Sequence, residues 1–252
     1  MAKVTWKPGT MLYPVPAAMI SCKHGAIENI ITISWIGTIC SDPPMVSISV
    51  RPSRYSYDII KNSGVFVINI PGKDLTYAAD FCGVKSGRDV DKFVHLSLGK
   101  EKASIVNVPI IAEAPIAIEC RVKDIIKLGS HDMFIADVVA VNVDEKYIDE
   151  MNRLNLDKAE LICYNHGKYC VASSPLGKFG YSVEKAKTKE KTAASKKKIN
   201  SASARSTTPT SAAIANANVS SSKSTSETTK SKPKAKPKTQ PKTKSRTKTK
   251  QK

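Results

Sequence analysis

Residues 29–57 read NIITISWIGTICSDPPMVSISVRPSRYSY, and this stretch decides the fold class. Two runs rich in β-branched residues, 30–40 and 45–50, flank a turn sequence, Ser41-Asp42-Pro43-Pro44. Runs of this kind on either side of a proline-rich turn are typical of adjacent β-strands. We therefore expect two neighbouring strands, followed by a corner at Arg51-Pro52 and a helix.

Side-chain alternation gives each expected strand an apolar face and a face of small hydroxyl groups. In 30–40 the two faces carry Ile31, Ile33, Trp35, Gly37 and Ile39 against Thr32, Ser34, Ile36, Thr38 and Cys40. In 45–50 they carry Val46, Ile48 and Val50 against Ser47 and Ser49, and Arg51 continues the second row. Small hydroxyls let a flat ligand approach the backbone and offer it hydrogen bonds. An ordinary solvated face has the same composition, so both interpretations stay open.

The segment from Arg51 to Tyr57 leaves a strand and enters a predicted helix over residues 54–62, with Ser53 as its cap and Gly64 just past its end. Free backbone N–H groups at a helix start attract anions, and arginine and serine side chains can add to them. The segment therefore predicts a phosphate site. The alternative is a capped surface helix with two solvated arginines.

The rest of the first 183 residues predicts mostly strands. Expected strands cover 14–22, 65–70, 116–128 and 131–143, with a final hairpin of 161–164 and 169–172 around His166-Gly167. Further short helices are expected at 75–82 and 144–154. Many strands with few helices between them indicate a mainly β domain, an antiparallel barrel with helical excursions.

Nearly all the net charge of +18 lies on residues 184–252, which hold 20 Lys and Arg against three Glu and contain no aromatic residue. Such a composition cannot bury enough apolar surface to fold, so we predict one domain over 1–183 and a disordered basic tail over 184–252. The tail suits non-specific attraction to nucleic acid or another polyanion. A merely solubilising extension is the alternative.

Several classes of protein are disfavoured by the sequence. No stretch predicts a membrane span, and an apolar run ending at Ser21-Cys22 resembles an export signal only faintly because Pro14 and Pro16 interrupt it. The six cysteines have no zinc-ligand spacing, so no metal site is predicted, and they are expected to be reduced in a cytoplasmic protein. Neither a P-loop nor a GxGxxG motif is present.

Three further features leave alternatives open. His131 follows a Gly129-Ser130 turn and is either structural or catalytic. Cys163 and Cys170 face each other in the expected hairpin, as packed thiols or as a redox pair. Cys40 and Cys82 are predicted to be small buried residues, and the alternative is that they lie near a cofactor.

Taken in order, the motifs of the chain resemble the flavin reductase-like family, and its flavoredoxin branch most. The resemblance rests on Asn29-x-x-Thr32-x-Ser34-Trp35-x-Gly37-Thr38, Asp42-Pro43-Pro44-Met45-Val46, Arg51-Pro52-Ser53-Arg54-Tyr55-Ser56, residues 64–69 (GVFVIN), Phe81-Cys82-Gly83, residues 86–93 (SGRDVDKF), Gly129-Ser130-His131 and residues 176–180 (LGKFG). Each motif is weak alone, but their joint presence over residues 10–183 is specific.

The resemblance implies an FMN-binding split β-barrel, a homodimer with a flavin at each inter-subunit cleft. It assigns cofactor binding to Thr32, Ile33, Ser34, Trp35, Ser49, Val50, Arg51, Arg54, Ser56, Tyr57, Cys82, Gly83, Ser86 and Lys92. Within that set, Arg54, Ser56 and Tyr57 are assigned to the phosphate. His131 matches a position on the nicotinamide side and is the candidate catalytic residue.

The activity implied by the resemblance is NAD(P)H-dependent flavin reduction, an oxidoreductase reaction in which hydride passes to FMN. The cofactor carries this chemistry, so a catalytic triad is not expected. The alternative is a non-enzymatic carrier that passes electrons between protein partners through bound FMN. The chain departs from many relatives at Ala136, where they have Gly, and in its basic tail, which leaves the binding of the hydride donor less supported than flavin binding.

Overall fold

The computed structural model describes residues 1–172 and 175–183. Met1–Tyr181 forms one compact unit, which contains every strand and α-helix of these described residues. The predicted disordered basic tail, residues 184–252, lies outside the described residues and stays a prediction. No helix in the described ranges is both long enough and apolar enough to cross a bilayer.

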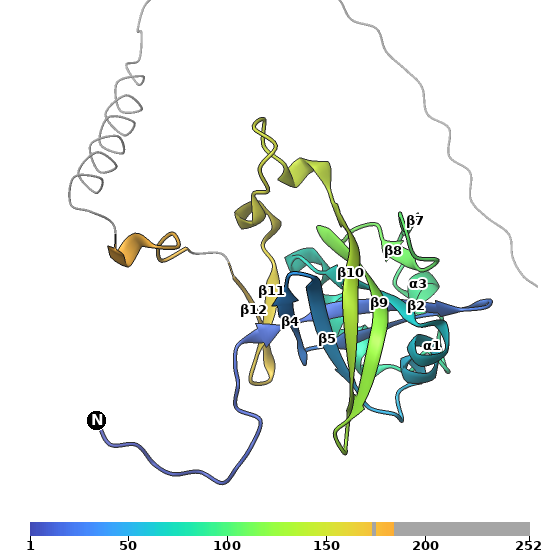
Figure 1. The fold of residues 1–252 in the computed structure, drawn as a ribbon, viewed down its shortest axis with the longest axis horizontal. Coiled ribbons are helices and arrows are strands. Elements are labelled where there is room, and N and C mark those ends of the chain that lie inside the picture. Colours follow the sequence, from blue (N-terminus) through green and yellow to red (C-terminus); the bar gives the residue numbers. More distant parts are fainter. Residues whose placement is uncertain (173–174, 184–252) are drawn as a thin grey trace, which may run out of the picture. The chain divides into compact units, whose positions relative to one another are not determined.

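Antiparallel strands make up most of the unit, as the sequence predicts (Figure 1). The strands are β1 Val15–Pro16, β2 Ala18–His24, β3 Ile27–Ile33, β4 Ile36–Ser41, β5 Pro44–Val50, β6 Val65–Ile70, β7 Lys100–Lys102, β8 Pro109–Ile111, β9 Ile116–Lys127, β10 Asp132–Val143, β11 Ile162–Asn165 and β12 Lys168–Val171. The α-helices are α1 Tyr55–Ser63, α2 Thr76–Val84 and α3 Lys92–His95. Single 3₁₀ turns are η1 Lys73–Leu75, η2 Glu145–Tyr147, η3 Leu156–Ala159 and η4 Tyr181–Val183.

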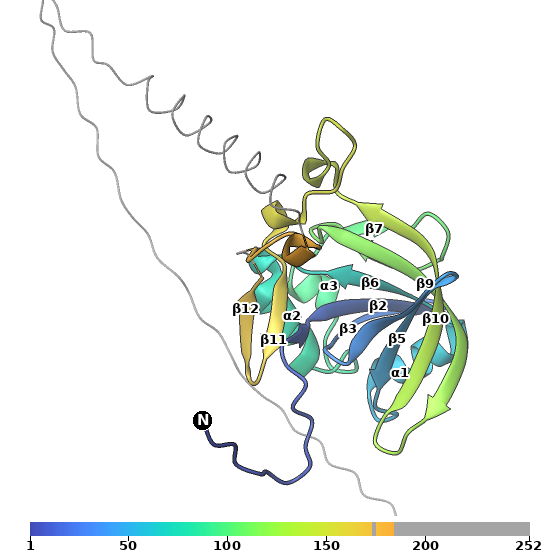
Figure 2. The same ribbon diagram turned by 60° about the vertical axis from the view of Figure 1, so that its left-hand side comes forward.

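Seven strands form one curled antiparallel sheet in the order β3-β2-β6-β9-β10-β5-β4 (Figure 2). Its two edge strands, β3 and β4, are consecutive in sequence and are joined by Ser34-Trp35 alone. The sheet must therefore curl until its edges meet at this link, where the Ser49 N–H donates a 2.9 Å hydrogen bond to the Trp35 carbonyl oxygen.

The prediction of one strand over 30–40 is therefore wrong. β3 ends at Ile33 and β4 begins at Ile36, because the chain leaves one edge of the sheet and joins the other. The two-faced pattern itself is confirmed in β5, where Val46, Ile48 and Val50 are buried and the serines between them are half-buried.

The largest apolar cluster fills the inside of the curled sheet. It includes Ile20, Ile48, Phe66, Cys120 and Phe134, all fully buried, and α1 covers it with Tyr57, Ile59 and Ile60. A second cluster packs α2, α3 and the β11–β12 hairpin on the other side of β2 and β3. These two clusters hold β2 and β3 between them, and the first also holds α1 against the sheet, which fixes segments that form the site.

A third cluster covers the outer face of β9, and Glu119 lies beside it. This carboxylate is fully buried and accepts hydrogen bonds of 2.7–2.8 Å from the backbone N–H groups of Ser104, Ile105 and Val106 and from the Asn142 amide. Burial acts to raise the pKa of Glu119, but these four donors outweigh it and lower the pKa overall. The charge therefore anchors the 103–108 loop.

The helices follow the sequence in part. Gly64 ends α1 in the left-handed conformation, with φ of 69°, which confirms its predicted place. The predicted Ser53 cap is wrong, because Arg54 occupies the N-cap position and no side-chain cap is formed. The helix predicted over 144–154 is also wrong, since only the turn η2 forms before Ile148 pairs with Leu154. The sequence does not predict the strands β7 and β8 or the short helix α3.

The final hairpin is confirmed. β11 and β12 pair around a two-residue turn, His166-Gly167, and the register places Cys163 opposite Cys170. β1 pairs with the other side of β11, so this small sheet has the order β1-β11-β12.

Candidate functional site

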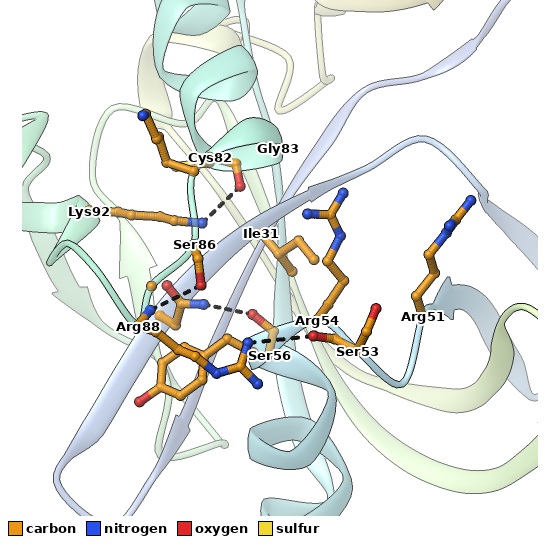
Figure 3. Close-up of a pocket in the computed structure, with 14 residues that line it drawn as sticks. Ile31, Arg51, Ser53, Arg54, Ser56, Cys82, Gly83, Ser86, Arg88 and Lys92 are labelled. Carbon is orange, nitrogen blue, oxygen red and sulfur yellow. Dashed lines mark hydrogen bonds between the residues drawn. The ribbon is translucent and has the colours of Figure 1, made fainter.

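A cavity of about 220 Å³ opens where three segments that are distant in sequence meet (Figure 3). We call it the basic cavity. Three segments surround it: β3, the corner between β5 and α1, and the stretch from the end of α2 to the start of α3. The lining residues are Asn29, Ile31, Arg51, Ser53, Arg54, Tyr55, Ser56, Cys82, Gly83, Lys85, Ser86, Gly87, Arg88 and Lys92. Five of these side chains are cationic and none of the described lining residues is acidic, so the cavity suits a phosphate or a similar anion.

Lys92 supports the wall of the basic cavity from inside the protein. It is 3% exposed, and its Nζ donates hydrogen bonds of 2.6 Å to the Ile30 carbonyl and 2.8 Å to the Cys82 carbonyl. Burial lowers the pKa of this ammonium group. Lys92 thus ties α3 to both β3 and α2, and it brings positive charge beneath the cavity.

A second buried contact joins β3 to the start of α1. The Asn29 amide donates a 2.9 Å hydrogen bond to the Ser56 hydroxyl, and both side chains are almost fully buried. Gly87 packs directly on this amide, because a Cβ at position 87 would lie 2.2 Å from Asn29 Oδ1. The close approach explains why glycine is needed at this position.

Arg88 lies at the mouth of the basic cavity. Its guanidinium stands 5.1 Å from the centre of the Tyr55 ring and donates a 3.5 Å hydrogen bond to the Ser53 carbonyl, while its backbone N–H bonds to the Ser86 hydroxyl at 3.2 Å. The 86–88 turn is thereby held against the start of α1 (Figure 3). A phosphate entering the cavity would meet this exposed cation together with Arg54.

A second cavity, of about 170 Å³, adjoins the first at the split between β3 and β5. We call it the strand cavity. The end of β3, the Ser34-Trp35 link, the end of β5 with the corner after it, and the residue before β10 line it. These residues are Ile31, Thr32, Ile33, Ser34, Trp35, Ser49, Val50, Arg51, Arg54 and His131. Ile31, Arg51 and Arg54 line both cavities, so the two form one continuous cleft.

Hydroxyl groups and one exposed indole shape the strand cavity. The Thr32 hydroxyl donates a 2.5 Å hydrogen bond to the Ala79 carbonyl, which joins β3 to α2. Trp35 remains 43% exposed although it sits in the link that closes the sheet. A planar ring could therefore lie along the hydroxyls and against the indole without displacing the apolar core.

His131 is held from three sides. Its ring lies 4.4 Å from that of Trp35, its Nε2 accepts a 3.4 Å hydrogen bond from Arg51 Nε–H, and its Nδ1 lies 2.9 Å from the Ser130 hydroxyl. Partial burial lowers the pKa of His131, and the charges of Arg51 and Arg54 add to this. Since Arg51 donates to Nε2, the neutral ring carries its proton on Nδ1. His131 therefore has no free N–H to offer in this arrangement.

The structure brings together all but one of the residues expected at a flavin site. The strand cavity holds Thr32, Ile33, Ser34, Trp35, Ser49, Val50 and His131, the basic cavity holds Ser56, Cys82, Gly83, Ser86 and Lys92, and Arg51 and Arg54 line both. Tyr57 lines neither cavity, because it turns into the core and its hydroxyl donates a 2.6 Å hydrogen bond to Asp132. That bond, with burial, raises the pKa of Tyr57 to about 12.

Sequence reasoning missed several residues of the basic cavity. Asn29, Tyr55, Lys85, Gly87 and Arg88 line it, although the sequence assigned none of these side chains a binding role; only Tyr55 lies within the segment predicted as a phosphate site. The SGRD sequence at 86–89 is a turn signal that stands between two predicted elements. It is the one local clue that an arginine would be fixed there.

Comparison with known proteins agrees with this geometry. The flavin reductase-like domain profile matches residues 10–173. The solved structure of a flavoredoxin from Desulfovibrio vulgaris is 28% identical and superposes with a TM-score of 0.68, over 73% of this chain and 100% of that one. An FMN-binding protein from Thermus thermophilus is 25% identical with a TM-score of 0.60, over 71% of this chain and 98% of its own.

Two further proteins are similar in sequence to part of the chain. The reductase component of a 4-nitrophenol monooxygenase from Rhodococcus opacus is 28% identical over 121 residues, 48% of this chain and 62% of that protein. An uncharacterized protein from Aeropyrum pernix is 30% identical over 133 residues, and the match spans half of its length. From the profile, the split between β3 and β5 and the superposed barrels, we conclude that this chain belongs to the flavin reductase-like family and has its split β-barrel fold.

Proposed function

We propose that the chain binds FMN, with the phosphate in the basic cavity and the isoalloxazine ring along the strand cavity. The observation that carries this proposal is the continuous cleft, cationic at one end and lined by hydroxyls and an indole at the other, with Arg51 and Arg54 at the junction. The cationic end suits a phosphomonoester, and the other end suits a flat heterocycle.

Each group then has a distinct role. Arg54, Arg88 and Lys85 bind the phosphate as exposed cations, while Ser53, Ser56 and the first turn of α1 supply shorter-range hydrogen bonding. Thr32, Ser34 and Ser49 border the ring, and Trp35 covers part of it. Lys92 acts from beneath by fixing α2 and α3 at the correct separation.

The proposed activity is the reduction of FMN by NAD(P)H. Bound FMN supplies the two-electron acceptor, so the chain itself needs to bind, orient and shield rather than to form a covalent bond. The thiol nearest to the cleft agrees with this, because burial raises the pKa of Cys82 to about 11 and keeps it protonated. His131 orients Arg51 and Trp35 at the open side, where the nicotinamide would approach.

Two measurements test the proposal on the purified full-length chain. FMN fluorescence should be quenched on titration with the protein, and riboflavin should bind more weakly, because riboflavin has no phosphate. NADH or NADPH oxidation should then depend on added FMN. A protein that takes up neither flavin would refute the assignment of the cleft, and one that takes up FMN without oxidising either nucleotide would refute the reductase activity alone.

A non-enzymatic electron carrier is the second candidate, and the similarity to a flavoredoxin favours it. The two functions differ in how the bound flavin becomes reduced. Under anaerobic conditions, rapid bleaching of the flavin by NAD(P)H alone supports the reductase, whereas bleaching only by a reduced protein partner supports the carrier.

We also propose a homodimer that completes the cleft. The first 14 residues carry exposed apolar side chains, including Trp6 at 74% and Leu12 at 85% exposure. Met11, Leu12 and Val15 line a cavity of about 670 Å³ that also includes Trp35. A monomeric mass by light scattering at micromolar concentration would contradict the dimer.

For residues 184–252 we propose non-specific binding to a polyanion, with the protein in the cytoplasm. Deleting residues 184–252 should leave FMN affinity unchanged and abolish salt-sensitive retention on DNA. Equal retention of both proteins at low salt would contradict this role.

A further inference from the structure

The β11–β12 hairpin carries two cysteines in a fixed relation that the flavin chemistry does not use. Cys163 and Cys170 are directly opposite each other in the antiparallel register, and Tyr164 faces Tyr169 in the next pair. Opposite residues point to the same side of a sheet and successive pairs alternate. The tyrosine pair packs against the second apolar cluster, so the cysteine pair lies on the other face of the hairpin.

The turn fixes the separation of the two cysteines. His166 and Gly167 have φ values of 46° and 88°, the signature of a two-residue hairpin turn that pairs Asn165 with Lys168. Hydrogen-bonded and non-hydrogen-bonded pairs then alternate, so 163 and 170 form a hydrogen-bonded pair, about 5.5 Å apart at Cα. Disulfides span Cα separations of about 4.4–6.8 Å, so this pair is within reach. They also bring the Cβ atoms to about 3.5–4.5 Å, closer than the roughly 5.5 Å of a hydrogen-bonded pair, so the two strands must shift locally and the bond would be strained and readily reduced.

These two cysteines are also the accessible pair. Cys170 is exposed on the edge strand β12 and Cys163 is half-buried, whereas Cys22, Cys82 and Cys120 are buried. Burial raises the pKa of Cys22 and Cys120 to about 12 and that of Cys82 to about 11, which keeps these thiols unreactive. Cys40 is half-buried but stands on β4, where its partner on β5 is Met45.

We propose that Cys163 and Cys170 form a reversible oxidation site, closed to an intramolecular disulfide by a low-molecular-weight disulfide such as oxidised glutathione. The exposed Cys170 thiolate attacks one sulfur of the oxidant, forms a mixed disulfide and releases one thiol. The Cys163 thiolate then attacks Cys170 Sγ and releases the second thiol. The protein loses two electrons and two protons, and the oxidant gains both as two thiols.

The cross-link would join the edge strand β12 to β11, which is also the strand that pairs with β1. Val15 of β1 lines the cavity beside Trp35. The oxidation site thus lies on a sheet that borders this neighbouring cavity, and it shares no residue with either flavin cavity. Its existence does not depend on flavin binding, so its test can fail or succeed independently.

Trypsin gives a direct readout, because Lys168 lies between the two cysteines. The full-length protein is equilibrated with mixtures of reduced and oxidised glutathione, blocked with iodoacetamide under denaturing conditions and digested. We expect peptides 159–168 and 169–178 to remain linked in oxidising mixtures, with the loss of two of the six alkylatable thiols, and to separate when reduced glutathione is restored.

Two variants make the result specific. Cys40→Ser should leave the linked peptides unchanged, and Cys163→Ser should convert the product to a glutathione adduct on Cys170. The proposal is overturned if the wild-type protein accumulates glutathione adducts on Cys170 without the cross-link, or if both thiols remain alkylatable throughout. It is also overturned if the linked peptides pair Cys170 with a cysteine other than Cys163.

Discussion

The two halves of the cleft are built in different ways. The strand cavity is made by segments that adjoin in sequence, the end of β3, its link to β4 and the end of β5, with His131 as the one distant addition. The basic cavity needs residues near positions 29, 54 and 88, which only the packing of α1, α2 and α3 on the sheet brings together. The strand cavity should therefore tolerate changes elsewhere in the fold, while the basic cavity depends on buried hydrogen bonds between distant segments.

The residues of the basic cavity fall into two kinds, exposed residues that would contact the ligand and buried residues that hold the cavity in shape. Arg54 and Arg88 are exposed, so their removal changes what the cavity attracts. Lys92 and Asn29 are buried, so their removal changes whether the cavity exists. The following experiments ask whether the two kinds of residue can be told apart.

The largest expected effect is that of Lys92→Met, which keeps an unbranched side chain, one atom shorter, and removes its charge. Two buried carbonyls, those of Ile30 and Cys82, would lose their donor. A lost charged hydrogen bond costs about 1.5–3 kcal/mol, so we expect the free energy of unfolding in urea to fall by about 3 kcal/mol. FMN affinity should fall with it.

Lys85→Met is the matched control, because Lys85 is an exposed cation that lines the same cavity. It should weaken FMN binding and leave the unfolding free energy within about 0.5 kcal/mol of the wild-type value. If the two variants unfold alike, the distinction between supporting and recognising residues is wrong for this cavity.

The sequence predicts the strand cavity better than the basic cavity, because the first is built from neighbouring segments and the second from distant ones. The hydroxyl row of Thr32, Ser34 and Ser49 follows from a period of two along the two expected strands, which is a local signal. Trp35 falls on the other face of that pattern, and only the family resemblance assigns it to the site. The break at Ser34-Trp35 could not be predicted, because it arises from closure of the sheet between strands at its two edges.

The basic cavity shows the other limit of the sequence. Arg88 and Asn29 carry no periodic signal, and their place in the site follows from a packing contact between Gly87 and Asn29. Tyr57 shows the reverse case. A residue beside the predicted phosphate site belongs instead to the core, since the first turn of α1 directs it towards Asp132 and Phe134.

The next largest effect is that of Arg54→Ala, which tests the division of the cleft by comparing two flavins. FMN affinity should fall about ten- to a hundredfold, the cost of one charge-assisted contact, because the phosphate loses a cation. Riboflavin affinity should change far less. Fluorescence titration of both flavins measures this, and Arg121→Ala, an exposed arginine on β9, should alter neither affinity. A parallel loss for both flavins would place the phosphate elsewhere.

Trp35→Leu should give the complementary pattern at smaller size. The indole borders the strand cavity and not the basic cavity, so FMN and riboflavin should both weaken, by roughly two- to tenfold, as expected for the loss of one aromatic contact. The same titrations apply. A selective loss of FMN binding would mean that the indole contacts the phosphate end, and it would reverse the proposed orientation of the flavin.

The smallest expected effect is a shift in the pKa of His131. This side chain lies beside Arg51, where the two cavities meet, so its pKa is sensitive to the charges there. Burial and the charges of Arg51 and Arg54 lower its pKa, so an NMR titration should place its midpoint below the ordinary value of 6.5, with His131→Asn identifying the signal. A lowered pKa means that the folded state resists protonation, so any stability this group contributes is present above pH 6.5 and is lost as the pH falls through the lower midpoint.

Replacing one of the two arginines shows how much of that shift is electrostatic. Arg51→Gln removes one charge and one hydrogen bond from the ring, so the His131 midpoint should rise while staying below 6.5, because burial remains the largest cause of the shift. The Arg121→Gln control should leave it unchanged. A wild-type midpoint at or above 6.5 would mean that the imidazole is solvated, and His131 could then no longer hold Trp35 and Arg51 at the point where the two cavities meet.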